Sequence, residues 1–408
     1  MTPIIAALRH HKTTVILVAL EIALTCAIVT NALFIIGDHM VTMSMHTGVA
    51  DNQLVWASST GIDDNATPAS YASRSAADLA ALSSMPGVKS AVMTNSLPLT
   101  NRSWKSCVHL QPGDDAKQSI CNIAFYFGTR GVVDTLGLKL VQGRDFLPQE
   151  YVNYDPFSDT PVPSAVIITA AMAKHMWPGE DPLGKPIFLG DKGKFVTHVV
   201  GVTEHMLNPN IAGKYNHKEL NLLFPVTSID GGMYVLRTTP AARDTVQRDL
   251  PKVLDRVDDQ RIITDNHSYV QTVKDYFRND RALIWLLLVV IGALLALTAL
   301  GVVGLSSFWV QQRAHQIGIR RAVGATRGDI VRYFLTENFL IVSIGIVLGL
   351  STAVGLNLWL MQHYELSHLP WSYLPAGALI LWLTGQLAVL GPALRAASVS
   401  PATATRNV

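Results

Sequence analysis

A short stretch in the middle of the chain has the spacing of a phosphate-binding loop. Residues 179–186 read GEDPLGKP, which fits the pattern G-x-x-x-x-G-K. In such loops a Ser or Thr after the lysine binds Mg²⁺, and backbone N–H groups surround the phosphates. Here Pro186 replaces the hydroxyl residue, Asp181 adds a negative charge, and Pro182 lacks an N–H group. We therefore interpret the stretch as a turn and expect no ATPase site of the chain's own.

Other motifs typical of catalytic or metal-binding sites do not occur in the sequence. The 13 histidines form no H-E-x-x-H or C-x-x-C…H pattern, so a zinc site has no support. No G-x-S-x-G motif provides a nucleophile. We therefore expect a chain that is not an enzyme and that binds no metal ion or cofactor.

Two of the three cysteines are candidates for a disulfide. Cys107 and Cys121 are fourteen positions apart, in a region that the charge distribution places outside the cytoplasm, where disulfides persist. Closing such a loop stabilises a fold by about 3 kcal/mol in the chain-entropy model. The alternative is a pair of buried free thiols. Cys26 lies in an apolar stretch, where we expect a small packing residue.

The composition indicates membrane spans. The spans determine on which side of the membrane the residues discussed above lie. The chain has 408 residues, of which 49% are hydrophobic and only 15% charged, whereas soluble domains usually have about 25% charged residues. Crossing a bilayer takes about 20 apolar residues in a helix. Four segments are long enough, residues 14–37, 282–310, 334–360 and 373–394. The first exceeds the apolar core of a signal peptide, so we interpret it as a retained anchor.

The distribution of Lys and Arg sets the expected topology, because basic residues concentrate in short cytoplasmic loops. Basic residues precede the first span, fill the loop 311–333 and follow the fourth span, whereas the loop 361–372 has neither Lys nor Arg. We therefore expect residues 1–13, 311–333 and 395–408 in the cytoplasm. Residues 38–281 and 361–372 are expected outside it.

The region 38–281 alternates short β-like runs with amphipathic helices. Strands are predicted at 54–58, 87–94, 164–169, 233–239 and 260–264, and helices at 75–84, 170–177 and 240–257. This repetition indicates α+β units, and the region is large enough for two subdomains. Residues 268–283 are predicted to form one helix that continues into the second span. The expected fold class is a membrane protein with four transmembrane helices and a large α+β extracytoplasmic domain inserted between helices 1 and 2.

The connector between the second and third spans contains five arginines and one acid. Residues 313–334 read RAHQIGIRRAVGATRGDIVRYF, in which QIGIRRAV predicts two helical turns that Gly324 then ends. Thr326 and Asp329 fit a capping box, so a new helix is expected to begin there and enter the third span. The arginines would suit topological anchoring and contact with anionic lipid as well as docking on a partner.

Small and acidic residues inside the spans are further candidates. Gly345 and Gly349 form a G-x-x-x-G pattern, which allows close helix approach in lipid. We consider them dimer-face candidates, with packing inside the chain as the alternative. Glu21 and Glu337 place carboxylates in apolar segments, which costs a few kcal/mol unless they are paired or functional. For Glu337 we expect a local ion pair with Arg332.

The order of residues in the connector resembles a known family. QIGIRRAVGATRGDIVRYFLTEN is similar to the signature of MacB/FtsX-type ABC-transporter permeases, R-x-x-E-I-G-[IVL]-R-[RK]-[AS]-[LIV]-G-[AM]-[TS]. The match runs without a gap from Ile317 to Thr326, with Gln316 where the family usually has an acid. GPALRAASVSPATATR resembles the family's closing motif, with Thr405 at its usual Leu position. SSMPGVKSAVM, VVDTLGLKLVQGRDF and AVIITAAMAKHMWPGEDPLGKPI resemble successive blocks of the MacB-like periplasmic core domain.

The resemblance implies a permease subunit that acts as a dimer, with a second copy or a paralogous permease. It also implies docking on a cytoplasmic ABC ATPase dimer, which binds ATP and Mg²⁺ and is a separate chain, because no fused ATPase domain is expected here. The residues implied in docking are Ile317, Gly318, Ile319, Arg320, Arg321, Gly324, Ala325, Thr326 and Arg327.

The implied function is to use ATP hydrolysis on that partner to move the periplasmic domain. This motion would export or extract a peptide, antibiotic, lipoprotein or other amphiphile from the outer face of the bacterial inner membrane. A periplasmic adaptor or substrate protein and membrane lipid are further expected partners, and nucleic acid is not. The alternatives are an FtsX-like signalling subunit that relays the ATPase state to a periplasmic partner, and a membrane-anchored sensor without an ATPase.

Overall fold

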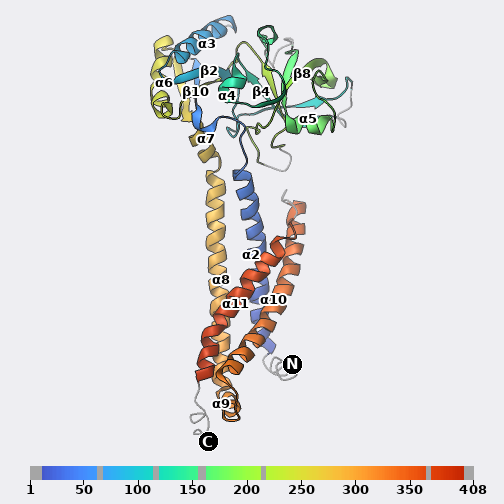
Figure 1. Cartoon of the computed structure of the whole chain (residues 1–408), viewed down its shortest axis with the longest axis vertical. Helices are drawn as coiled ribbons and strands as arrows, with labels where there is room; N and C mark the ends of the chain where they lie inside the picture. Colours follow the sequence, from blue (N-terminus) through green and yellow to red (C-terminus); the bar gives the residue numbers. More distant parts are fainter. Residues whose placement is uncertain are drawn as a thin grey trace. The chain divides into compact units, whose positions relative to one another are not determined.

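Four long apolar helices and one inserted β-rich domain make up the described part of the chain (Figure 1). The computed structural model describes residues 12–61, 68–113, 119–154, 162–212, 217–363 and 369–398. Two compact units are distinguished: Met1–Ser44 with Asn279–Val408, and Met45–Arg278. The predicted insertion of a large domain between the first and second apolar helices is therefore confirmed. The predicted segments 1–13, 361–372 and 395–408 lie partly outside the described residues.

The first unit contains the four helices that are long and apolar enough to cross a membrane. They are α2 (Lys12–Met43), α8 (Arg278–Gln312), α10 (Arg327–His363) and α11 (Tyr373–Ser398). Each helix extends beyond the apolar segment predicted for it. A short helix, α9 (Ala314–Ala322), lies in the connector between α8 and α10.

The first helix, α2, packs along α10 and also contacts α11 (Figure 1). Val18, Ile22 and Cys26 recur every four residues and therefore share one face of α2. They are buried in an apolar cluster with residues of the other three helices, among them Ile346 of α10. Asn31 extends this contact, because its side-chain amide donates to the Ala353 carbonyl at 3.3 Å.

The second unit is built on a strand network with 11 strands in its described residues. The order is β11-β1-β10-β2-β4-β3-β7-β8-β6-β9, with β5 paired to β8. The strands are β1 (Leu54–Gly61), β2 (Val88–Thr94), β3 (Trp104–His109), β4 (Ile120–Gly128), β5 (Leu140–Gly143), β6 (Ala165–Thr169), β7 (Pro186–Leu189), β8 (Phe195–Thr203), β9 (Asn221–Pro225), β10 (Met233–Thr238) and β11 (Arg261–Ser268). Strands β2 and β4 pair only through Thr94 and Gly128. The strands thus form two groups, an arrangement compatible with two subdomains.

Helices cover both strand groups. They are α3 (Pro68–Ser83), α4 (Val132–Leu136), α5 (Ala170–Met176), α6 (Arg243–Val257) and α7 (Tyr269–Tyr276), with 3₁₀ turns at Asp51–Gln53, Pro148–Glu150 and Asp191–Gly193. Val246, Leu250 and Leu254 form the apolar face of α6, which packs with α3 on β1, β2 and β10. Met172 and Met176 of α5 pack on the other strand group.

The predicted single helix over 268–283 is wrong. Helix α7 ends before Phe277, which has φ −89° and ψ 14°, and α8 begins at Arg278. Two aromatic residues explain the break. Phe277 is buried, and the Tyr276 hydroxyl accepts a hydrogen bond from the Ile211 N–H at 3.0 Å, so both side chains hold the end of α7.

Candidate functional site

The connector has the predicted order of a short helix, a glycine turn and a capped helix. Helix α9 ends at Ala322, and Gly324 adopts φ +112°, a conformation that glycine tolerates best. Thr326 precedes α10, and its hydroxyl accepts from the Asp329 N–H at 3.2 Å. The Asp329 carboxylate in turn accepts from the Thr326 N–H at 3.0 Å. The predicted capping box is thus confirmed, and it fixes where α10 begins.

One face of α9 is packed against the membrane helices. Ile317 and Gly318 are buried. Ile317 belongs to an apolar cluster with Ile330 and Phe334 of α10 and with three alanines of α11. Two of the predicted docking residues therefore support the connector from the inside and are not on its surface.

The other face of α9 is open and carries apolar and basic side chains. Ile319 is 47% exposed and Val323 is 84% exposed. These residues are four positions apart and share a face. Gln316 and Arg320 are also exposed, and the Arg320 guanidinium lies over the Tyr333 ring at 5.0 Å. Gly324, Thr326 and Arg327 continue the open surface, whereas Arg321 and Ala325 are half-buried.

Val323 was absent from the predicted docking residues. The family signature that suggested those residues allows any of several aliphatic side chains at this position. A signal was nevertheless present, because Val323 follows Ile319 by four residues and directly precedes the glycine that ends the helix.

Glu337 of α10 is buried and pairs with an arginine other than the expected one. The expectation of a local pair with Arg332 is wrong, because the partner is Arg313, with Nη1 3.0 Å from each carboxylate oxygen. Arg332 is exposed. An arginine far away in sequence can reach Glu337 because the chain turns back at the end of α8. The Arg313 guanidinium also lies over the Trp309 ring at 5.6 Å.

The G-x-x-x-G residues of α10 face another helix of the same chain. A Cβ atom at Gly345 would lie 2.7 Å from the Ile22 side chain, and one at Gly349 would lie 2.5 Å from Cβ of Cys26. Both glycines thus allow α2 to approach α10 closely. The packing alternative is thus borne out for Gly345 and Gly349 within one chain, and a dimer face at these residues stays a prediction.

Glu21 lies on α2, at a position where α8 comes close. A Cβ atom at Gly301 would be 2.8 Å from its carboxylate. One turn further along, the hydroxyl groups of Thr25 and Thr298 are 3.1 Å apart. Glu21 and Thr25 of α2 thus both lie close to α8, and Thr25 makes a polar contact with it.

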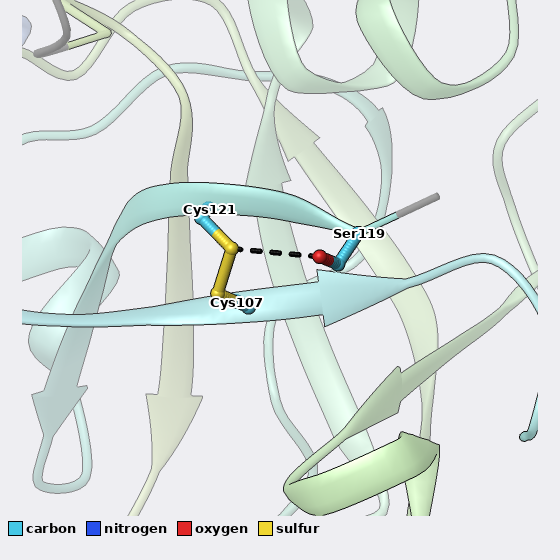
Figure 2. Close-up of a disulfide and its surroundings, with 3 residues drawn as sticks. All are labelled: Cys107, Ser119 and Cys121. Carbon is cyan, nitrogen blue, oxygen red and sulfur yellow. Dashed lines mark hydrogen bonds between the residues drawn. A yellow bond between two sulfur atoms is a disulfide. The ribbon is translucent and has the colours of Figure 1, made fainter. Parts of the chain in front are cut away.

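The cysteines of the inserted domain are joined. Cys107 on β3 and Cys121 on β4 form a disulfide, and the Ser119 hydroxyl lies 3.5 Å from Sγ of Cys121 (Figure 2). The two strands are antiparallel neighbours, so the disulfide links adjacent positions of one hairpin. In the described ranges, no three His, Cys, Asp or Glu side chains are grouped closely enough to hold a metal ion.

The stretch with phosphate-loop spacing is a turn between α5 and β7, as interpreted. Gly179 and Gly184 have φ values of +79° and +74°, which give the turn its shape. The Lys185 ammonium group pairs with the Glu180 carboxylate and lies 5.4 Å from the Trp177 ring. Lys185, the lysine of the phosphate-loop pattern, thus makes these contacts within the turn.

Comparison with known proteins assigns the connector and its helices to a family. Residues 288–401 match the model of the FtsX-like permease C-terminal domain. The macrolide export ATP-binding/permease protein MacB of Agrobacterium fabrum is 28% identical over 243 residues, which cover 54% of this chain and 33% of that protein. The uncharacterized ABC transporter permease YknZ of Bacillus subtilis is 22% identical over 340 residues, 81% of this chain and 78% of that protein.

A solved structure also aligns with part of this chain. The crystal structure of the periplasmic region of MacB from Actinobacillus actinomycetemcomitans aligns with 58% of this chain and 98% of its own, at 16% identity and a TM-score of 0.36. The chain spans a third or less of the length of several curated relatives that it matches. Residues 288–401 therefore contain an FtsX-like permease C-terminal domain, and the chain is similar to the MacB and YknZ permeases.

Proposed function

We propose that the chain is the permease subunit of an ABC complex whose ATPase is a separate cytoplasmic dimer. ATP hydrolysis on that partner displaces α9, and the membrane helices pass the displacement on to the inserted domain. This proposal rests on the exposed face of α9. Its residues Ile319, Arg320 and Val323 lie next to a glycine turn and a capped helix. In the matched family this connector is the element expected to contact the ATPase.

Docking on a partner protein explains the exposed residues on this face of α9 better than anchoring of the membrane topology alone. Anchoring of the topology requires positive charge but no exposed aliphatic groups. Val323 is almost fully exposed, and leaving such a side chain in water costs about 1.5–3 kcal/mol relative to burying it. A mixture of apolar side chains with arginine is typical of protein interfaces. We therefore assign this face to contact with the ATPase.

We also propose that the inserted domain lies outside the cytoplasm, at the outer face of a bacterial inner membrane. The arginines of the connector favour a cytoplasmic position for α9. The disulfide between Cys107 and Cys121 supports an oxidising compartment for the inserted domain. We infer the substrate class from a relative, since the name of the Agrobacterium protein assigns macrolide export to that protein. An amphiphile handled on the outer side is therefore the proposed substrate.

Co-purification from mild detergent tests the complex. We expect an ABC ATPase to accompany the unaltered chain and to be lost from the double variant Arg320→Glu with Arg321→Glu. The variant Val323→Asp leaves the arginines in place and is expected to weaken the association as well. Arg395→Glu is the matched control, because Arg395 is exposed on α11 and outside α9. Normal binding and normal ATPase stimulation in both α9 variants would contradict the proposal.

An ATPase-inactive partner separates export from signalling. With such a partner, the complex should assemble but release no amphiphilic substrate from the outer face. Unchanged release would exclude ATP-driven export and would favour a subunit that relays the ATPase state to a periplasmic partner.

A further inference from the structure

The ion pair between Arg313 and Glu337 lies where the connector joins the membrane helices. Helix α8 ends at Gln312 and α9 begins at Ala314, so Arg313 occupies the turn between them. The side chain of Glu337 is 1% exposed and that of Arg313 is 13% exposed. Loss of one partner from a pair so well buried leaves an uncompensated charge.

Arg313 connects three helices at one point. It precedes the first residue of α9, its guanidinium contacts Trp309 of α8, and its ion-pair partner belongs to α10. The next residue of α10, Asn338, donates a hydrogen bond to the Gly385 carbonyl of α11 at 2.9 Å. A chain of polar contacts therefore runs from the start of α9 to α11.

The short helix α9 depends on such attachments. It has nine residues, and isolated helices of that length are not stable in water. Ile317 attaches its middle to the apolar cluster, but apolar contacts have no preferred direction and permit the helix to roll. A charge-assisted hydrogen-bonded pair has a preferred geometry and fixes the direction in which α9 leaves α8.

We propose that Arg313 and Glu337 are positioning residues that hold α9 rigidly on α8 and α10. With the pair intact, a force on α9 moves the membrane helices. Without it, the turn at Arg313 bends and absorbs the force. That an ATPase exerts the force on α9 rests on the proposed function. The attachment of α9 to α8 and α10 depends only on residues of this chain.

Hydrogen exchange of the full chain in detergent tests the attachment without any partner. Glu337→Gln keeps the shape of the side chain and removes its charge. We expect the amides of 314–322 to exchange about tenfold faster in this variant, because local opening becomes easier, with exchange in the middle of α10 unchanged. Arg313→Lys keeps a positive charge for Glu337 but loses the planar guanidinium over the Trp309 ring, so its exchange should be accelerated less than that of Glu337→Gln. Arg395→Gln, at an exposed arginine of α11, is the control.

Two results would overturn the proposal at this stage. One is unchanged exchange of 314–322 in Glu337→Gln, and the other is equal acceleration in the Arg395→Gln control. If Glu337→Gln does not accumulate in membranes, Arg313→Gln replaces it in the same comparison, because its side chain lies at the edge of the buried site.

Titration of the ATPase with permease variants tests the transmission. For Glu337→Gln we expect maximal stimulation of ATP hydrolysis to fall about fivefold or more, with the half-maximal permease concentration changed by less than about threefold. Arg313→Lys should restore at least half of the stimulation, which a general loss of stability would not predict. Full stimulation by Glu337→Gln would overturn the proposal. If the unaltered chain recruits no ATPase, the proposed function fails, and the exchange experiment alone decides on the attachment.

Discussion

Asp78 and Arg261 form the most deeply buried ion pair of the inserted domain's described residues. Their side chains are 0% and 2% exposed, and two hydrogen bonds of 2.8 and 2.9 Å join them. The Tyr234 hydroxyl donates a third bond to Asp78 at 2.5 Å, which contributes to raising the pKa of Tyr234, although burial is the larger cause. The group ties α3 to β10 and β11. It stabilises their arrangement only while every polar atom has its partner.

Asp78→Asn is therefore expected to reduce the free energy of unfolding by about 3–5 kcal/mol, because the Arg261 charge stays buried with only the more distant Asp258 carboxylate, at 3.8 Å, as counter-charge. Thermal unfolding of the full chain measures the loss. Replacing the whole group, with Asp78→Leu, Arg261→Met and Tyr234→Phe, should recover much of it. A triple variant less stable than Asp78→Asn would contradict this account.

Glu150 gives the inserted domain a predictable pH dependence. Two hydrogen bonds from Arg144, at 2.9 and 2.6 Å, hold the pKa of Glu150 below its ordinary value, and the Leu147 N–H contributes. A lowered carboxyl pKa stabilises the fold above the ordinary Glu pKa of about 4.3. This stabilisation is lost as the pH falls through the lowered value.

Glu150→Gln keeps an oxygen for the Leu147 N–H but loses the charge. At pH 7 we expect a loss of about 0.5–1 kcal/mol, since Arg144 is partly exposed to solvent. The melting temperatures of the two proteins should converge as the pH is lowered below about 4. A difference that stays constant from pH 7 to pH 3 would show that the charge of Glu150 has no part in it.

At the scale of elements, helices and strands are predicted best from the sequence where one face or one whole segment is apolar. The four long helices follow from uninterrupted apolar runs, and α6 from its four-residue apolar spacing. Strands β3, β4, β5, β7, β8 and β9 were not predicted as strands. Strand β3 is mixed in polarity (WKSCVH), and β7 has only four residues (PIFL). The pairing of these two strands joins segments that are distant in sequence. The end of α7 at Phe277 likewise depends on tertiary contacts that no local pattern contains.

The close contact between α2 and α10 can be tested with two glycines of one helix. Gly349→Ala places a methyl group 2.6 Å from the Ala23 carbonyl oxygen, and the backbone there has no room to yield. We expect a loss of about 1–3 kcal/mol, the usual cost of overpacking. Gly355→Ala is the control, since a Cβ atom there has no neighbour within 4 Å. Equal melting temperatures of the two variants in detergent would contradict the packing role of Gly349.

At the scale of the whole molecule, the local conformation of the connector was predicted, whereas its role in docking stays a prediction. The glycine turn and the capping box follow from local residue order, so Gly324, Thr326 and Asp329 were assigned correctly. Burial separates the docking residues into an inner set with Ile317 and an outer set with Ile319, and burial depends on how α9 meets its neighbours. Prediction of the Arg313–Glu337 pair likewise requires knowing how α9 meets its neighbours. Without that knowledge, Arg332 was expected as the partner because it is nearer in sequence.

The four apolar helices also make a prediction for the topology of the whole chain, because four crossings return the C-terminal segment to the side of the N-terminal one. Cysteine labelling in a Cys26→Ala background tests it, as the two other cysteines are bonded to each other. Val323→Cys on α9 should react with a membrane-impermeant maleimide only from the cytoplasmic side. Lys252→Cys on α6 and His363→Cys at the end of α10 should react in intact spheroplasts, because all three positions are exposed.

The positions Val323 and His363 decide the topology, since Val323 lies shortly before α10 and His363 is the last residue of that helix. Labelling of both from the same side would mean that α10 does not cross the membrane. The number of crossings would then be odd, and the assignment of the connector to the cytoplasm would lose the agreement between its arginines and the remaining loops. Labelling from opposite sides, with Lys252 on the side of His363, places α9 where a cytoplasmic ATPase can reach it and the inserted domain where it cannot.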